Sequence, residues 1–207
     1  MSKSLYIAEK PSVAQEFANA LKINGRRSDG YIESEQAIVT WCVGHLVTMS
    51  YPECYDPKYK RWSLETLPFL PKEFKYEVIP SVEKQFKIVS GLLNRPDVDT
   101  IYVCTDSGRE GEYIYRLVAQ MADVKDKAQK RVWIDSQTEE EILRGIREAK
   151  DETEYDNLSA SAYLRAKEDY LMGINFSRLL TLKYGQNISN YLRTGKNTVI
   201  SVGRVMT

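Results

Sequence analysis

Short apolar runs alternate along the chain with segments in which apolar residues recur every three or four positions. The runs that predict strands are residues 4–8, 37–43, 100–104 and 131–134. The segments with helical spacing follow Ser12, cover 82–93, pass through Ile114 to Met121, and follow Thr138. Strands that alternate with helices are typical of a largely parallel sheet flanked by helices. The pattern therefore predicts an α/β fold.

Two of these predicted helices begin with the spacing of a capping box. In such a box a hydroxyl side chain and an acid or amide three positions later satisfy each other's free backbone groups. Ser12 with Gln15 and Thr138 with Glu141 have this spacing. We therefore expect helices to start at these two places.

The α/β pattern ends near residue 150. Residues 151–154 form a charged connection, and 159–184 have the pattern of one long helix. Residues 51–80 are rich in Pro, Tyr and Lys with little periodicity, and we interpret them as a long ordered loop. We expect a first domain at residues 1–152 and the start of a mainly helical second domain at 153–207.

The composition is that of a folded globular protein. The 207 residues are 43% hydrophobic and 28% charged, which allows one good core and part of a second. No apolar stretch reaches the roughly 18 residues of a membrane helix, and the start lacks a signal-peptide pattern. We therefore expect a cytoplasmic protein without a membrane partner. Cys42, Cys54 and Cys104 lack zinc-site spacing and are interpreted as reduced thiols.

The charge is balanced overall but not along the chain. Basic and acidic residues number 29 each, so the net charge gives no argument for a nucleic-acid partner. Asp169 is the last acidic residue, and the five basic residues beyond it are interleaved with Tyr184 and Tyr191. Such a segment suits a phosphate backbone with stackable bases, although a solvated helical face would look similar.

Carboxylates follow two of the predicted strands. Glu9 comes after the first strand, and Asp106 with Glu110 follows the strand at 100–104. Functional groups collect beyond the carboxyl ends of parallel strands, so the three acids could meet there and bind Mg²⁺. The alternative is that Ser107 and Glu110 only cap a helix, because acids are favourable at a helix N-terminus.

Several blocks of sequence resemble one enzyme family. Residues 7–12 (IAEKPS) and 105–112 (TDSGREGE) are similar to the paired signature of the Toprim domain as found in type IA DNA topoisomerases, particularly the topoisomerase III kind. Further blocks agree in order: residues 44–46, 62, 67–71, 131–138, 165–178 and 201–205. The resemblance spans nearly the whole chain, and the last two blocks separate topoisomerases from other Toprim proteins.

The resemblance implies roles for the acids and for the lysine beside Glu9. Glu9 would help to hold Mg²⁺ and exchange a proton with the scissile 3′-oxygen, while Lys10 would stabilise the phosphate. Asp106 and Glu110 correspond to two of the three acids in the family's Asp-x-Asp-x-Glu pattern. Gly108 stands where the middle acid would be, so we expect a weaker metal site that is completed by water.

The resemblance also implies contacts with single-stranded DNA. Arg165 and Asp169 correspond to a pair that points toward the cleavage site, and Arg178 and Arg204 to residues that grip the strand. An arginine fork can take a phosphate bidentately. His45, the only histidine, is interpreted as a turn or packing residue.

Type IA enzymes cut one DNA strand with a tyrosine, pass a strand through the gap and reseal it without ATP. None of the 14 tyrosines lies in the matching motif. We therefore expect an N-terminal fragment in the bacterial cytoplasm or nucleoid, inactive alone, that acts with the parent's remaining domains. The alternatives are a primase-like or nuclease Toprim activity, and a non-catalytic DNA-binding or recombination-mediator module.

Overall fold

The computed structural model describes residues 2–196 and 198–203. The chain forms two compact units, each built from two segments of sequence. Unit 1 comprises residues 1–48 and 77–162, and unit 2 comprises residues 49–76 and 163–207. The segment 49–76 thus groups with the C-terminal segment. The division into domains at residues 152 and 153 stays a prediction.

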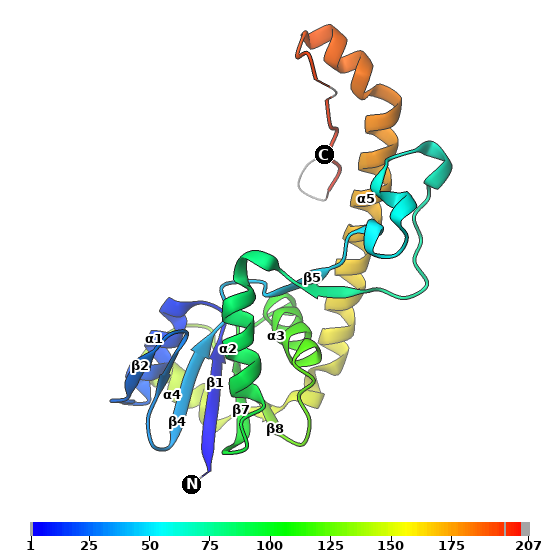
Figure 1. The fold of residues 1–207 in the computed structure, drawn as a ribbon. Coiled ribbons are helices and arrows are strands. Elements are labelled where there is room, and N and C mark those ends of the chain that lie inside the picture. Colours follow the sequence, from blue (N-terminus) through cyan, green and yellow to red (C-terminus); the bar gives the residue numbers. More distant parts are fainter. Residues whose placement is uncertain (1, 197, 204–207) are drawn as a thin grey trace. The chain divides into compact units, whose positions relative to one another are not determined.

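Unit 1 is organised around one mixed sheet in which the parallel strands occupy the centre (Figure 1). The strand order is β2-β3-β4-β1-β7-β8-β9. The strands are β1 (Lys3–Ala8), β2 (Arg26–Ser28), β3 (Tyr31–Glu33), β4 (Ala37–Trp41), β7 (Val98–Cys104), β8 (Ala128–Arg131) and β9 (Lys150–Asp151). Strands β4, β1, β7 and β8 are parallel, and β2, β3 and β9 add antiparallel pairs. The predicted α/β fold with a sheet flanked by helices is confirmed.

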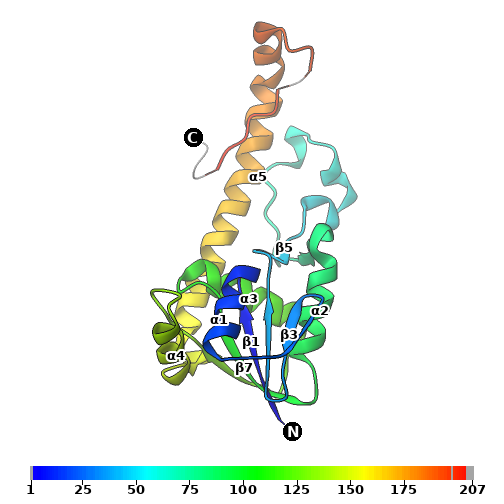
Figure 2. The ribbon, with the colours of Figure 1, turned by 90° about the vertical axis from the view of Figure 1, so that its left-hand side faces the viewer.

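Helices cover both faces of this sheet (Figure 2). The helices are α1 (Pro11–Ala20), α2 (Glu83–Leu93), α3 (Arg109–Met121) and α4 (Glu139–Arg147). Helices α1 and α4 pack on the face that carries Tyr6 and Ala8, with Phe17 and Ile142 in the same core. Successive side chains of a strand point to opposite faces, so the wholly buried Leu5 lies on the other face, which α2 and α3 cover.

The helix starts differ in part from the capping boxes expected from the sequence. Helix α1 begins with Pro11 after Lys10, without a side-chain cap, so the Ser12–Gln15 box does not form. Proline suits this position because its missing N–H would have no helical partner. Thr138 does cap α4 by accepting from the Glu141 amide, at 3.4 Å. The Glu141 carboxylate accepts from the Asp135 amide, so only half of that box is present.

Two further expectations about the sheet need correction. The strand expected at 131–134 lies earlier, because β8 ends at Arg131. The hairpin of β2 and β3 was not expected, although it turns at Asp29 and Gly30, and Gly30 has φ +81°. An Asp-Gly pair between strands is a hairpin signal because glycine adopts positive φ without a steric cost.

Unit 2 contains short 3₁₀ helices and most of one long helix. The 3₁₀ helices are Pro52–Cys54, Pro57–Lys60 and Leu64–Thr66, within the segment expected to be a loop. Helix α5 (Asp156–Leu192) starts in unit 1 and continues through unit 2, and it is longer than the helix predicted at 159–184. Phe69 is 2% exposed and packs edge-on against Tyr59 and Tyr170.

The remaining elements are short connections. Strands β5 (Val47–Met49) and β6 (Tyr76–Val78) form a two-stranded sheet. The 3₁₀ helices Pro80–Val82 and Glu152–Tyr155 precede α2 and α5 respectively. Among the described residues, no helix combines the length and the apolar character that crossing a bilayer requires.

Candidate functional site

Three neighbouring parallel strands end at the same edge of the unit 1 sheet. Ala8 at the end of β1 is in register with Trp41 of β4 and with Cys104 of β7. The helix after β1 packs on one face of the sheet, and the helix after β7 packs on the other. The loops after β1 and β7 therefore diverge, and such divergence is where open α/β sheets bind ligands.

Glu9 and Asp106 come together at this edge. The Asp106 amide lies 3.3 Å from Glu9 Oε2 and donates to it. Glu9 is 7% exposed, whereas Asp106 is exposed. Burial raises the pKa of Glu9, and the neighbouring Asp106 charge raises it further. Both effects arise because a buried carboxylate is poorly hydrated and is repelled by a like charge.

Glu110, the third predicted metal ligand, has another partner. Its Oε1 lies 2.6 Å from His45 Nε2. Its side chain is 72% exposed. His45 follows Gly44, which has a φ of +80° and whose amide donates a hydrogen bond to the Glu9 carbonyl. These two features direct the loop after β4 back toward β1. His45 was expected to be a turn or packing residue, and it also contacts the Tyr113 ring edge-on.

The acids do not form a ready metal cluster. Among residues 2–196 and 198–203, no group of three His, Cys, Asp or Glu side chains is placed to hold a metal ion. Two of the three predicted ligands are neighbours, and the third is held by His45. The assignment of Glu9, Asp106 and Glu110 as metal ligands stays a prediction.

Lys10 lies next to these acids but is not locked to them. Its Nζ is 3.9 Å from Glu9 Oε1, and its side chain is 57% exposed. A weakly paired, solvent-facing ammonium group is able to turn toward an anion placed beside Glu9. The structure therefore leaves Lys10 available for the phosphate role that was predicted for it.

A pocket of about 330 Å³ opens beside Asp106. Its lining includes Val13 of α1, Ser107, and Gln137 from the loop before α4. Ser107 does not cap α3, because its Oγ donates to the Ile134 carbonyl and accepts from the Ile134 amide. The capping-box alternative for Ser107 and Glu110 is therefore wrong, and Gly108 occupies the N-cap position instead.

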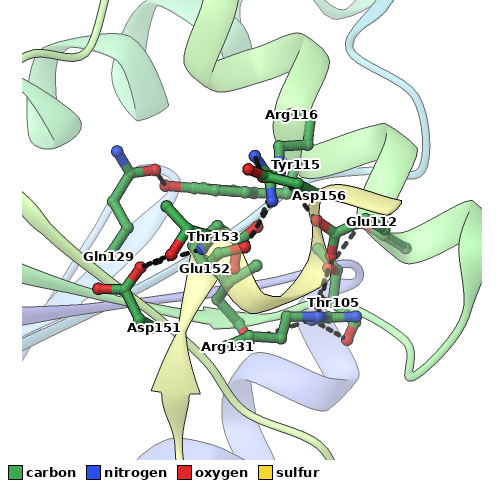
Figure 3. A network of polar contacts seen from close by, with 12 residues as sticks. Thr105, Glu112, Tyr115, Arg116, Gln129, Arg131, Asp151, Glu152, Thr153 and Asp156 are labelled. Atoms are coloured by element: carbon green, nitrogen blue, oxygen red, sulfur yellow. Dashed lines mark hydrogen bonds and ion pairs between the residues drawn. The ribbon is translucent and has the colours of Figure 1, made fainter. Parts of the chain in front are cut away.

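Behind this edge lies a buried polar network that sequence reasoning missed (Figure 3). Arg131 at the end of β8 is wholly buried and contacts the backbone at Thr105 and Asp106. Glu112 of α3 is also wholly buried and faces Arg131. The sequence holds one signal for this network: Arg131 lies at a strand end and Glu112 lies inside an amphipathic helix. A charged residue that is buried at such a position requires a partner.

The predicted DNA-binding residues of unit 2 have different surroundings. Arg165 of α5 is exposed, and Asp169 one turn later is half-buried. Arg178 is 6% exposed, donates to the Tyr59 carbonyl and stacks its guanidinium over the Trp62 ring at 5.3 Å. Burial lowers the pKa of Arg178. Arg204 lies outside the described residues.

Comparison with known proteins agrees with this architecture. A family model described as the Toprim domain matches residues 4–136. DNA topoisomerase 3 of Staphylococcus epidermidis is 46% identical over 187 residues, which covers 90% of this chain and 26% of the relative. DNA topoisomerase 3 of Bacillus cereus is 46% identical over 189 residues, which covers 91% of this chain and 26% of the relative. The chain thus spans about a quarter of the length of these curated relatives.

Proposed function

The chain belongs to the Toprim domain family, and on that premise we propose that it is the N-terminal part of a type IA DNA topoisomerase of the topoisomerase III kind. The observation that carries the proposal is the meeting of Glu9 and Asp106 at the ends of β1 and β7. The similarity to proteins named DNA topoisomerase 3 supports it. The proposed substrate is single-stranded DNA, and the proposed location is the bacterial cytoplasm or nucleoid.

The residues at the sheet edge suit the handling of a phosphate. Lys10 has a solvent-facing ammonium group that can stabilise charge developing on the phosphate oxygens. Glu9 is proposed to exchange a proton with the 3′-oxygen, and its position directly after β1 places its carboxyl group beside that lysine. Asp106 adds a second, exposed carboxylate to the same edge.

The paired acids fit a divalent cation. Two carboxylates share this edge, one of them largely withdrawn from water, and a hard cation would offset both the burial and the mutual repulsion. Glu9 and Asp106 are the proposed ligands of Mg²⁺, and Glu110 would join them by leaving His45. Bound Mg²⁺ would supply positive charge to hold and polarise the phosphate. With the acid count reduced by Gly108, binding should be weak.

Calorimetry of Mg²⁺ binding tests this site. The parent chain should bind Mg²⁺ weakly, and a Glu9→Gln, Asp106→Asn variant should lose binding because both acids become neutral amides. Glu16→Gln, which changes an exposed acid of α1, is the matched control and should bind as the parent does. Equal binding by the double variant and the parent would contradict the assignment.

The tyrosine that cuts DNA is proposed to lie outside these 207 residues. The purified chain should therefore leave supercoiled plasmid neither nicked nor relaxed when Mg²⁺ is present. It should still bind single-stranded DNA, with an affinity that falls as salt rises because phosphate contacts release counterions. Relaxation by the chain alone would refute this part of the proposal.

A non-catalytic Toprim module that binds DNA is the second candidate. Gly108 in place of an acid and the absence of a three-residue metal cluster among the described residues favour it. The two candidates can be distinguished by joining this chain to the part of a topoisomerase 3 relative that it does not cover. Restored relaxation supports the topoisomerase, whereas a folded, DNA-binding but inactive joined protein supports the non-catalytic module.

A further inference from the structure

Arg131 has no role in the function proposed above, yet its side chain is wholly buried in unit 1. Burying a charged group is costly unless it is paired and hydrogen-bonded. The contacts that offset the cost show what the residue holds in place (Figure 3).

The guanidinium of Arg131 binds the backbone that carries Asp106. Nη1 donates to the carbonyls of Val103 at 3.1 Å and Thr105 at 2.8 Å, and it also reaches Thr105 Oγ1 at 3.1 Å. Nη2 donates to the Asp106 carbonyl at 2.6 Å. Arginine can make these bonds together because its donors are fixed in one plane. One side chain thus holds the backbone at the end of β7 and at the first two residues after it.

Glu112 supplies the opposite charge and fixes the direction of the guanidinium. Its Oε2 is 3.2 Å from Arg131 Nε, and both side chains are wholly buried. Its Oε1 accepts from Arg116 Nε at 2.8 Å. Arg116 then faces Glu152 at 3.2 Å and Asp156 at 2.9 Å. Arg116 therefore belongs to the same network, and its own ion pairs are with Glu112, Glu152 and Asp156 (Figure 3).

The Asp106 backbone also acts on Glu9. The Asp106 carbonyl accepts a hydrogen bond from Arg131, and the Asp106 amide donates one to Glu9 Oε2. A shift of this peptide would move the Asp106 carboxylate and release the Glu9 carboxylate together. Side chains behind metal ligands commonly tune a site in this way.

We propose that Arg131 is a positioning residue that, with Glu112 as its counter-charge, holds the Asp106 backbone so that the carboxylates of Glu9 and Asp106 face the same point. This inference rests on the proposed function, in which that point is the Mg²⁺ site. It does not need Glu110 to be a ligand.

The test uses paired substitutions that keep the buried charges balanced. Arg131→Met with Glu112→Gln removes both charges of one buried pair and leaves side chains of similar volume. Replacing both partners is tolerated better than removing one. The matched control is Arg116→Met with Asp156→Asn, which removes the neighbouring ion pair of the network, whose atoms are 2.9 Å apart. Hydrogen exchange of the Asp106 amide and the affinity for Mg²⁺ are measured on the full 207-residue chain.

In the Arg131 variant the Asp106 amide should exchange at least about tenfold faster, because local opening becomes easier. Its Mg²⁺ affinity should fall by about 10- to 100-fold, as for other residues behind metal ligands. The control variant should keep both values near those of the parent. Unchanged exchange at Asp106 in the Arg131 variant, or an equal change in the control, would overturn the proposal.

The test still decides the proposal if the first variant does not fold or if the parent does not bind Mg²⁺. Should Arg131→Met with Glu112→Gln not fold, Arg131→Lys keeps the charge but replaces the two nitrogens that share the three carbonyls by a single one, and the same change at Asp106 is expected. Should the parent not bind Mg²⁺, the proposed metal function fails, whereas the exchange of the Asp106 amide still decides whether Arg131 positions this loop.

Discussion

Glu152 is a carboxyl group that folding places in an unfavourable environment. It is 4% exposed, and the Arg116 Nε lies 3.2 Å from its Oε1. Burial, followed by the nearby charge of Glu112, raises its pKa to about 8, against the lowering effect of Arg116. The group therefore keeps its proton to higher pH in the folded protein than in the unfolded chain.

This difference predicts a pH-dependent stability. Because the folded pKa is the higher one, the stabilisation is present below about pH 4.5 and is lost as pH rises through about 8. In that interval the free energy of unfolding should fall by up to about 1.4 kcal/mol per pH unit from this group. Urea denaturation at pH 5 to 9 should show a shallower fall for Glu152→Gln than for the parent. Glu154→Gln, a neighbouring exposed acid, should behave as the parent, and equal slopes for all three would contradict this.

Gly108 has room for the acid that the family pattern places there. Its φ of 172° and ψ of 178° are extended, so any residue can adopt this backbone, and a Cβ would meet no atom within 4 Å. Gly108→Asp should therefore fold normally and bind Mg²⁺ about fivefold or more tightly, because one added charge contact is worth on the order of 1 kcal/mol even in water. Titration calorimetry measures this. Gly108→Asn is the uncharged control, and equal affinities for both variants would argue against a cation at this edge.

The paired acids could be predicted from the sequence, but their surroundings could not. Glu9 and Asp106 each follow a recognisable strand, and parallel neighbours bring such residues together. His45 with Glu110, and Arg131 with Asp106, are joined across 65 and 25 positions of sequence. No local pattern encodes those pairs, because they depend on how loops close after the sheet has formed.

At the scale of elements, helix α3 is fitted tightly against the loop before it. A Cβ on Gly111 would lie 2.1 Å from the Asp106 carbonyl oxygen, and Thr105 Oγ1 donates to the Gly111 carbonyl at 2.7 Å. The first turn of α3 therefore tolerates only glycine at this position without movement of the backbone. This close approach helps to keep the Asp106 loop in place.

A pair of glycine substitutions tests this fit. Gly111→Ala should destabilise unit 1 by about 1–3 kcal/mol, the usual cost of overpacking. Gly91→Ala in α2, where a Cβ would meet nothing within 4 Å, should stabilise by roughly 0.5–1 kcal/mol because alanine favours helix. Chemical denaturation of the two variants and the parent measures both effects. A Gly111→Ala protein as stable as the parent would show that the loop moves easily.

The long, periodic elements could be predicted and the short ones could not. Strands β1 and β7 and helices α2 and α3 have clear apolar patterns, and the structure confirms them. Strand β9 is only two residues long, too short for any periodicity. Strand β8 ends at Arg131, while the apolar residues that suggested a strand follow it. There the hydrophobic pattern marked residues that pack against the core without belonging to a strand, although the Val132 amide still donates to the Val103 carbonyl at 2.9 Å.

At the scale of the whole molecule, the chain has two compact units with separate cores. Phe69 lies at the centre of unit 2, where Asn175 binds both its amide, at 2.6 Å, and its carbonyl, at 2.9 Å. Its ring also packs against Tyr55. The segment expected from sequence to be a loop thus provides core residues, because aromatic and proline residues can bury surface without regular secondary structure.

Removing the Phe69 ring should affect one unit more than the other. Phe69→Ala should cost unit 2 about 3–5 kcal/mol, as is typical for a buried aromatic ring. Hydrogen exchange should become faster in residues 49–76 and 163–192 and stay slow in β1 and β7. Leu70→Ala, next in sequence but 66% exposed, is the control and should change little. Equal acceleration in both units would mean that they unfold together.

The sheet of unit 1 ends on both sides in short antiparallel strands. Strand β2 is the three residues Arg26–Ser28, and β9 is Lys150–Asp151. Short strands with charged side chains at the edges of a sheet offer an incoming strand few free backbone groups. Although strands β4 and β7 are rich in valine and isoleucine, the folded protein should therefore resist fibril growth from the edges of its sheet, even when it is concentrated.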